Sequence, residues 1–491
     1  MEYGNVWKTY EEYDLVTLEA LARDYIGFIS ACKTERECTA WAITYAEECG
    51  YTPLEEAIAQ GRALKAGDKV WVHIQGKALI LAHIGTEPLS AGLNILGAHI
   101  DSPRLDIKQN PLYEANDFAL LDTHYYGGIK YYQWVTIPLA IHGVVVKKTG
   151  ESVEVVVGED KDDPVFCVTD LLIHLAGEQM DKVAKKAVEG ENLDVLVGSQ
   201  PLVFEAADGA DDADEDNDGD GADAGQGASE GKLRKLAKKE PVKAMLLKIL
   251  AEKYGIEEED FLSAELEVVP AGPARDCGFD SSMILGYGQD DRVCAYPSLR
   301  AQLSLHQPKK TAVCVLTDKE EIGSVGATGM ASRFFENTIA EIMELAGEDS
   351  GLSLRRALAA SSMLSSDVSA GFDPLYASVF EAKNAAYLGK GLVFNKFTGA
   401  RGKSGSNDAS AEYLAKIRAI MEDSGVAFHM AELGRVDAGG GGTIAYILAE
   451  YGMDVIDSGV AVLSMHSPWE VSSKADIYEA YKGYKAFLEE A

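Results

Sequence analysis

Residues 94–103 read NILGAHIDSP, a short apolar run that ends at His99 and Asp101. Three further strand candidates also end at an acidic residue or a histidine: TAVCVLT at 311–317, SSMLSS at 361–366 and AVLSM at 461–465. Segments with apolar residues three and four positions apart, a spacing typical of helices, separate these runs. Strands that alternate with helices predict an α/β fold with a mostly parallel central sheet covered on both faces.

The middle of the chain has a different pattern. The segment GVVVKKTGESVEVVVG at 143–158 predicts two strands around a turn. The stretch VPAGP at 269–273 is typical of a domain boundary. We therefore expect one discontinuous α/β domain, made of residues 1–110 and 271–491, that is interrupted by an inserted β-rich domain at 111–270.

The composition is that of a globular protein, because 47% of the 491 residues are hydrophobic and 25% are charged. A net charge of −34 argues against nucleic acid or anionic membranes as partners. No apolar run approaches the roughly eighteen residues of a membrane helix, and the first residues do not resemble a secretory signal. Seven scattered cysteines without a CxxC pair indicate a reducing compartment, so we expect a cytoplasmic protein.

Much of the negative charge lies in one segment. Between Glu205 and Glu230 there are eleven acidic residues and no basic ones, a composition that predicts a mobile surface loop at 205–231. Its stretch DEDNDG at 214–219 resembles the opening of a calcium loop, but the twelfth position is Gly225 where a glutamate is needed. A solvated insertion is therefore favoured over a calcium-regulated binding module.

The residues that follow the predicted strands carry the chemistry, because ligands of open α/β sheets collect at the carboxyl ends of strands. These residues, together with two acids at a predicted helix start, are His99, Asp101, Asp290, Asp291, Glu320, Glu321, Asp367 and His466. Carboxylates gathered at one place repel one another unless a cation neutralises them. Two histidines with several carboxylates suit a pair of divalent transition ions, with zinc as the first choice.

A site with two ions needs one carboxylate that bridges them and another, not a ligand, that takes a proton from the attacking water. The adjacent Glu320 and Glu321 could divide the work, with one facing an ion and the other facing the water. Asp101 follows His99 by two residues on an extended segment and could hold the second N–H of its ring.

At these residues the sequence resembles the M18 metallopeptidases, the family of aspartyl aminopeptidases and vacuolar aminopeptidases. The motifs that carry the resemblance occur in family order: GAHIDSPRLDIKQNP (97–111), GYGQDDRVCAY (286–296), TDKEEIGSVGA (317–327), SSDVSAGFDP (365–374) and SMHSPWEV (464–471). The resemblance implies a dizinc catalytic domain, an inserted domain that builds a dimer, and dimers assembled into a tetrahedral dodecamer. It further implies that the chain hydrolyses the N-terminal residue from peptides with two zinc ions per subunit, or with cobalt or manganese in their place.

The resemblance also implies individual roles. His99 and Asp367 would hold one ion and Glu321 and His466 the other, with Asp290 as the bridge. Asp291 is the alternative to Asp290 for that bridging position.

The same resemblance makes Glu320 the general base and later the proton donor to the leaving amine, while Asp101 orients His99. A histidine from a neighbouring subunit enters the site in this family, and the segment TDLLIHLAGEQM at 169–180 makes His174 the candidate. Aspartyl aminopeptidases pair the acidic substrate side chain with a lysine of a GPVIK-type stretch. The matching stretch GLVFNK at 391–396 has Asn395 at that position, so the preference for an acidic or a neutral N-terminal residue stays open.

Two other functions are compatible with the same residues. A dizinc hydrolase could act on N-acyl amino acids, and assays with both substrate types would separate it from an aminopeptidase. A catalytically silent shell protein built on the peptidase fold is the second alternative, and metal analysis would test it.

Overall fold

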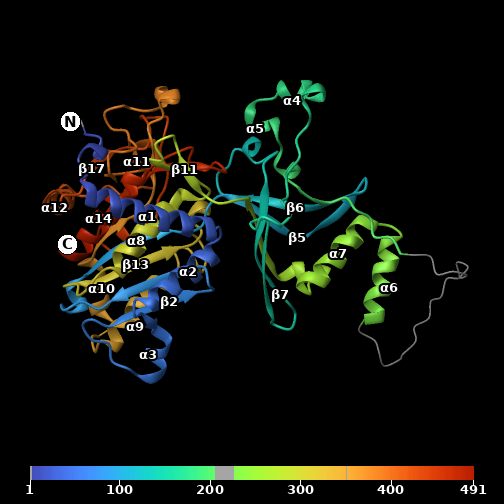
Figure 1. The fold of residues 1–491 in the computed structure, drawn as a ribbon. Helices are drawn as coiled ribbons and strands as arrows, with labels where there is room; N and C mark the ends of the chain where they lie inside the picture. Colours follow the sequence, from blue (N-terminus) through green and yellow to red (C-terminus); the bar gives the residue numbers. More distant parts are fainter. Residues whose placement is uncertain (1–2, 205–225, 350) are drawn as a thin grey trace, which may run out of the picture. The chain divides into compact units, whose positions relative to one another are not determined.

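The computed structural model describes residues 3–204, 226–349 and 351–491 and consists of two compact units (Figure 1). The first unit comprises Met1–Pro103 and Pro273–Ala491, and the second comprises Arg104–Gly272. The first boundary falls before the expected residue 110, because β5 (Arg104–Ala115) is one continuous strand of the second unit.

Within the described residues, the first unit is built around a nine-stranded mixed sheet. In spatial order its strands are β1 (Thr52–Pro53), β2 (Lys69–Ile74), β3 (Ala78–His83), β13 (Thr311–Thr317), β4 (Leu93–His99), β14 (Ser362–Ser365), β18 (Asp454–Gly459), β16 (Leu392–Asn395) and β17 (Phe428–Ala431). The central strands β13, β4, β14 and β18 are parallel. β3 and β16 flank them in the antiparallel direction. β3 also pairs antiparallel with β2, which it follows through a tight turn at Gln75 and Gly76, both with positive φ. The predicted α/β class is confirmed.

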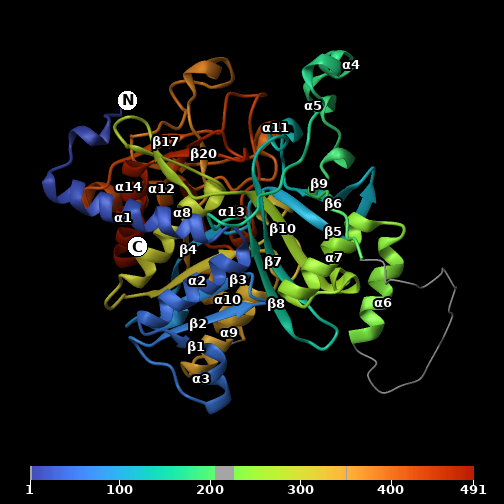
Figure 2. The same cartoon turned by 45° about the vertical axis from the view of Figure 1, so that its right-hand side comes forward.

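Helices cover both faces of this sheet (Figures 1 and 2). One face packs against α1 (Glu12–Ala31), α2 (Glu35–Glu48), α8 (Gln289–Leu303), α12 (Ala411–Asp423) and α14 (Lys474–Glu490). The other packs against α3 (Leu54–Gln60), α9 (Phe334–Leu345), α10 (Leu352–Ala359) and α13 (Ala445–Ala449). Leu96 and Cys314 point into the first core and Ile95 and Val313 into the second, which explains why β4 and β13 read as continuous apolar runs. No helix in the described ranges has the length and apolarity to cross a membrane.

A second sheet of the first unit, five-stranded as far as the chain is described, was not expected from the sequence. Its strands are β11 (Arg275–Cys277), β12 (Met283–Gly286), β20 (Glu470–Ser473), β19 (Ala461–Leu463) and β15 (Ser369–Ala370). The run AVLSM at 461–465 therefore belongs to this sheet, and the assignment of it to the central sheet is wrong. The central sheet instead takes β18, and the chain passes directly from β18 to β19 at Val460.

The second unit is β-rich. Its described part contains a six-stranded antiparallel sheet in the order β8 (Ser152–Val157), β7 (Leu139–Val146), β10 (Ala264–Pro270), β5, β6 (Phe118–Tyr126) and β9 (Val195–Gly198). The strands β7 and β8 form the predicted hairpin at 143–158, with Val145 opposite Val153. The helices of this unit are α4 (Gly177–Met180), α5 (Ala184–Ala187), α6 (Gln226–Ala237) and α7 (Pro241–Tyr254).

Most of the acidic segment, residues 205–225, lies outside the described residues, and with it the calcium-like stretch at 214–219. Residues 226–231 belong to α6, so the expected loop at 205–231 is wrong over this part. The helix is favoured there because Glu230 pairs with Arg234 one turn later, at an Nη2–Oε1 distance of 2.8 Å.

Two buried histidines of the first unit are held neutral. His83 ends β3 and His429 lies in β17, and burial lowers the pKa of each imidazole to about 4. Nε2 of His429 accepts a hydrogen bond from the backbone N–H of Tyr387 (3.0 Å), which requires that nitrogen to carry no proton. The folded chain therefore resists protonation at a pH where the unfolded chain becomes charged.

We expect the free energy of unfolding to fall as the pH drops from about 6.5 to about 4, because only the unfolded chain then takes up these protons. Below about pH 6.5, His83 lowers the free energy of unfolding by about 1.4 kcal/mol per pH unit, so the total decrease at about pH 5 is roughly 2 kcal/mol. In His83→Met, the urea midpoint should therefore change less between about pH 7.5 and about pH 5 than in the parent chain. The exposed His73→Gln is the matched control, and an unaltered pH dependence in His83→Met would contradict the neutral state of His83.

Candidate metal centre

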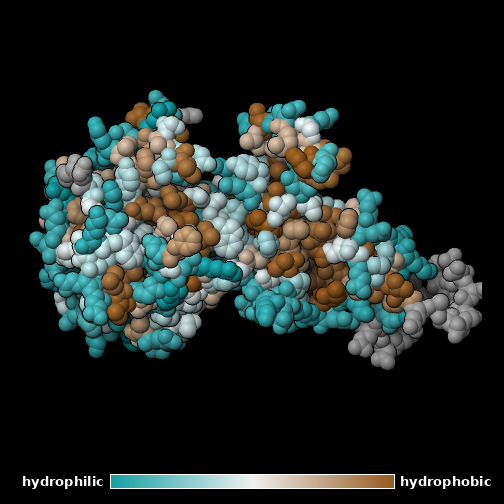
Figure 3. All heavy atoms as spheres, turned by 45° about the horizontal axis from the view of Figure 1, so that its top comes forward, coloured by the Kyte–Doolittle hydropathy of each residue, from teal (hydrophilic) through white to brown (hydrophobic). Residues whose placement is uncertain are grey.

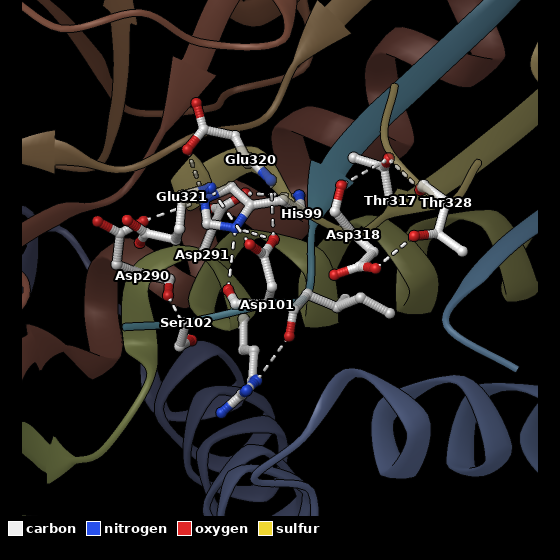
Figure 4. A network of polar contacts seen from close by, with 12 residues as sticks. His99, Asp101, Ser102, Asp290, Asp291, Thr317, Asp318, Glu320, Glu321 and Thr328 are labelled. Carbon is white, nitrogen blue, oxygen red and sulfur yellow. Dashed lines mark hydrogen bonds and ion pairs between the residues drawn. The ribbon is translucent and has the colours of Figure 1, made fainter. Parts of the chain in front are cut away.

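Two neighbouring strand ends position the first site residues. β4 ends at His99, whose register partner Thr317 ends β13. The chain then passes through Lys319, with φ of 68° in the left-handed region, and enters a 3-10 turn at Glu320–Ile322. This turn places both glutamates beside His99 (Figure 4).

The start of α8 supplies two further carboxylates, Asp290 and Asp291, which are joined by a cis peptide bond. Gly288 precedes them with φ of +70°, and a Cβ at this position would collide with the Arg292 guanidinium and the Ser102 hydroxyl. Ser102 Oγ also donates a hydrogen bond to the carbonyl of Asp290 (2.7 Å). Glycine at 288 therefore lets the chain turn closely enough to bring both carboxylates to the end of β4.

Asp290 lies between two histidines. Its Oδ1 is 3.2 Å from Nε2 of His99, and its Oδ2 is 3.1 Å from Nε2 of His466. The same His466 nitrogen is 3.5 Å from Oε2 of Glu321. One carboxylate thus directs one oxygen to each imidazole, which is the arrangement that a bridging ligand between two ions needs.

Two overlapping groups of ligand atoms result. Those of His99, Asp290 and Glu321 lie within 4.8 Å of one another, and so do those of His99, Asp291 and Asp367. The structure therefore brings all five ligands expected from the sequence into one cluster, with Asp291 as a sixth member: His99, Asp290, Glu321, Asp367 and His466.

This cluster fits divalent zinc. Asp291 Oδ1 and Glu321 Oε1 are buried, and neither accepts a hydrogen bond from any residue in the described ranges. Buried carboxylate oxygens are costly without a partner, and a cation satisfies them. Imidazole nitrogens together with carboxylate oxygens are also the ligands that zinc takes in catalytic sites.

The electrostatics of the cluster agree with this fit. Burial raises the pKa of Asp291, Glu321 and Asp367 well above the usual carboxyl range. At Asp290 burial acts in the same direction, but hydrogen bonds from the two histidines outweigh it and hold the pKa below its usual range. A bound cation would let all four carboxyl groups ionise together.

Glu320 and Glu321 differ in their surroundings although they are adjacent. The side chain of Glu321 is 3% exposed and contacts His466, whereas that of Glu320 is 16% exposed. Oε2 of Glu320 is 3.9 Å from Nε2 of His99, and burial raises the pKa of Glu320 to about 7. Glu320 therefore lies beside the ligand cluster, within reach of a water molecule at the site.

Asp101 makes more contacts than the sequence suggested. Its carboxylate Oδ1 is 3.2 Å from Nδ1 of His99, and its carbonyl lies 3.0 Å from the same nitrogen. The carboxylate also accepts hydrogen bonds from the backbone N–H groups of Glu320 (3.1 Å) and Glu321 (3.2 Å). Asp101 thus fixes the ring of His99 and the adjacent glutamate turn together.

Sequence reasoning missed Glu470, at the start of β20. Its carboxylate is 1% exposed and accepts hydrogen bonds from the backbone N–H groups of Asp290 (3.1 Å) and His466 (2.8 Å). The only signal in the sequence is its position four residues after His466 in SMHSPWEV.

Two other residues singled out in the sequence are not among the members of this cluster. His174 belongs to the second unit, in a 3-10 turn at Ile173–Leu175. Asn395 ends β16 of the first unit, where it is buried and its Nδ2 donates a hydrogen bond to Ser369 Oγ (2.7 Å). The neighbouring Lys396 instead pairs with Asp408.

Comparisons with known proteins indicate the family to which this chain belongs. The family model described as aminopeptidase I zinc metalloprotease (M18) matches residues 28–488. The chain is 58% identical to a probable M18 family aminopeptidase 1 of Clostridium acetobutylicum, over 99% of this chain and 98% of the relative. It is 43% identical to the corresponding protein of Thermotoga maritima, over 100% of this chain and 99% of the relative.

Solved structures give the same result. The crystal structure of an M18 family aminopeptidase from Thermotoga maritima matches with a TM-score of 0.88, 43% identity and full coverage of both chains. That of aminopeptidase I from Clostridium acetobutylicum matches with a TM-score of 0.87 and 56% identity, over 99% of each chain. A structure of the S. cerevisiae mApe1 dodecamer shares the fold, with a TM-score of 0.74 at 18% identity over 96% of this chain and 97% of that one. This chain belongs to the M18 family of zinc metalloproteases and is an aminopeptidase.

Proposed function

We propose that this chain removes the N-terminal residue from peptides with two zinc ions, held by the five residues His99, Asp290, Glu321, Asp367 and His466. The observation that carries the proposal is the position of Asp290, with one carboxylate oxygen directed at each histidine. When bound, two such ions polarise the scissile carbonyl and acidify a water molecule.

In this proposal the protein residues manage the protons. Glu320 takes a proton from the attacking water and later gives it to the amine that leaves, so the carboxyl group is restored after each cycle. Its greater exposure than Glu321 and its position 3.9 Å from His99 support this division of roles. Asp101 keeps the ring of His99 and the turn of Glu320 and Glu321 in fixed positions relative to each other during the reaction.

We also propose that the chain forms dimers that assemble into a tetrahedral dodecamer, and that His174 enters the site of a neighbouring subunit. The segment around His174 supports this proposal, because its apolar side chains are strongly exposed in the single chain and a neighbouring subunit would bury them. The exposed fractions are 54% for Leu172, 68% for Ile173 and 69% for Leu175. Figure 3 shows apolar side chains exposed on the second unit. The related mApe1 structure is described as a dodecamer. A cytoplasmic location is proposed as well, and all seven cysteines, which lie in described parts, are free thiols.

For the substrate we expect a neutral N-terminal residue to be preferred over an acidic one. Asn395 offers no positive charge to pair with an acidic side chain, and its Nδ2 is already engaged by Ser369. Leucine p-nitroanilide should therefore be cleaved at least about tenfold faster than the aspartate compound, since a missing ion pair that costs about 1.4 kcal/mol corresponds to a factor of ten.

The same assay tests the proposed function when zinc is measured alongside and N-acetyl-leucine is included. We expect two zinc ions per chain and no release from the acetylated compound. Cleavage of N-acetyl-leucine in place of the aminoacyl substrates would favour the N-acyl amino acid hydrolase. A chain that binds no metal and cleaves neither substrate would be the silent shell protein. Adding zinc, cobalt or manganese back to metal-free protein identifies the ion that gives the highest rate.

A further inference from the structure

We propose that Glu470 is a positioning residue that holds His466, a ligand of one ion, against the bridging Asp290, an inference that rests on the dizinc site proposed above. Glu470 is none of the five proposed ligands. Its carboxylate instead accepts a hydrogen bond from the backbone of two of them, at 3.1 Å and 2.8 Å.

The two ligands that Glu470 joins come from distant parts of the chain. Asp290 lies at the start of α8, and His466 follows β19. Each oxygen of the Glu470 carboxylate is assigned to one of them, Oε2 to the Asp290 N–H and Oε1 to the His466 N–H. The carboxylate therefore sets the spacing between two backbone segments whose side chains meet at 3.1 Å.

His466 needs such support because its backbone is strained. Its φ of 64° lies in the left-handed region, which residues other than glycine rarely adopt. A conformation of this kind persists where surrounding contacts determine it. The hydrogen bond from the His466 N–H to Glu470 is such a contact, and it keeps the imidazole directed at Asp290 and Glu321.

Strand pairing and hydrogen bonds fix the position of Glu470 itself. It begins β20, where it is paired with Gly286 of β12. Its carbonyl accepts a hydrogen bond from Nε2 of Gln289 (2.6 Å), and Oε1 of Gln289 accepts one from Ser472. The five-stranded sheet thus carries the carboxylate, and Gln289, the residue directly before Asp290, links this sheet to the start of α8.

The site consequently has two buried carboxylates that act on the backbone in the same way. Asp101 holds the turn of Glu320 and Glu321, and Glu470 holds Asp290 and His466. Ser102 also anchors Asp290 through its carbonyl. His466 has the strained backbone and serves only one of the two proposed ions, so loss of Glu470 should weaken that ion more than the other.

The test measures bound metal, so it does not depend on catalysis. The parent chain and Glu470→Gln are loaded with zinc, separated from excess metal and titrated with a competing chromophoric chelator. Glutamine has one acceptor oxygen, and its NH₂ group would face a second N–H donor, so one hydrogen bond is lost. We expect the parent to hold two ions and the variant to bind one of them about 10–100-fold more weakly. This is the usual effect of losing a residue that hydrogen-bonds to a metal ligand without binding the metal itself.

Asp476→Asn is the matched control. The Asp476 carboxylate is also buried and accepts two backbone N–H groups, those of Gly389 and Gly391, both at 2.7 Å. These glycines precede β16, at the opposite end from Asn395. This control loses the same kind of hydrogen bond, and we expect it to keep both ions with parental affinity.

Each outcome decides between the alternatives. Parental affinity for both ions in Glu470→Gln overturns the positioning role, and equal loss of both ions overturns its selectivity. Fewer than two ions in the parent chain would refute the dizinc site itself, independently of any variant. If Glu470→Gln does not fold, Glu470→Asp gives the same test, because its charge remains while its shorter side chain cannot reach both N–H groups. In a His466→Ala background, Glu470→Gln should have little further effect on zinc content.

Discussion

Glu320→Gln should keep both zinc ions and lose peptide cleavage by about 10³-fold. Glutamine has nearly the same size as glutamate but cannot take a proton from the attacking water. Zinc binding should survive because Glu320 is not one of the five proposed ligands and is the more exposed of the two adjacent glutamates. The measurement is kcat and KM for leucine p-nitroanilide, with zinc content determined on the same protein.

Glu321→Gln is the comparison that gives this result its meaning. Glu321 contacts His466 at 3.5 Å and is buried, so its substitution should lower zinc content as well as activity. If Glu320→Gln instead loses metal while Glu321→Gln keeps it, the two roles are exchanged. Unchanged turnover in Glu320→Gln would remove the general base from the proposal.

The sequence predicted the centre of the sheet because those strands are buried on both faces. β4 and β13 are strands of seven residues, mostly apolar and buried throughout. Charged or polar residues directly after such strands are not needed for packing, so they indicate a functional site. Their parallel pairing, with Thr317 opposite His99, makes the polar ends meet. The sequence alone therefore predicts that the histidine and the two glutamates lie at one edge of the sheet.

The same reasoning could not find the five-stranded sheet or Glu470. Strands of two to four residues, such as β15, β19 and β20, are too short to show a periodic pattern. A carboxylate that accepts backbone N–H groups leaves no mark in the sequence either, since its partners Asp290 and His466 become neighbours only in the folded chain. The role of Asp101 was predicted in part, because its contact with His99 is local while its contacts with the glutamate turn are not.

Asp290 and Asp291 are adjacent carboxylates that compete for one role, and they lie differently enough to be separated. Asp290 directs its two oxygens at His99 and His466. Asp291 is grouped with His99 and Asp367, and its Oδ2 already accepts a hydrogen bond from the backbone N–H of His99 (3.3 Å). Only Asp290 therefore reaches residues proposed for both ions.

Asp290→Asn should consequently release both zinc ions and lower kcat/KM by about 10³-fold or more, because the shared negative charge between the ions is lost. Asp291→Asn should affect at most the ion of His99 and Asp367, since these are the two ligands with which Asp291 is grouped in the described chain. Zinc titration of both variants, with circular dichroism to verify folding, distinguishes them. The bridge would move to Asp291 if its variant lost both ions while Asp290→Asn kept one, because a bridging ligand is the one whose removal neither ion tolerates.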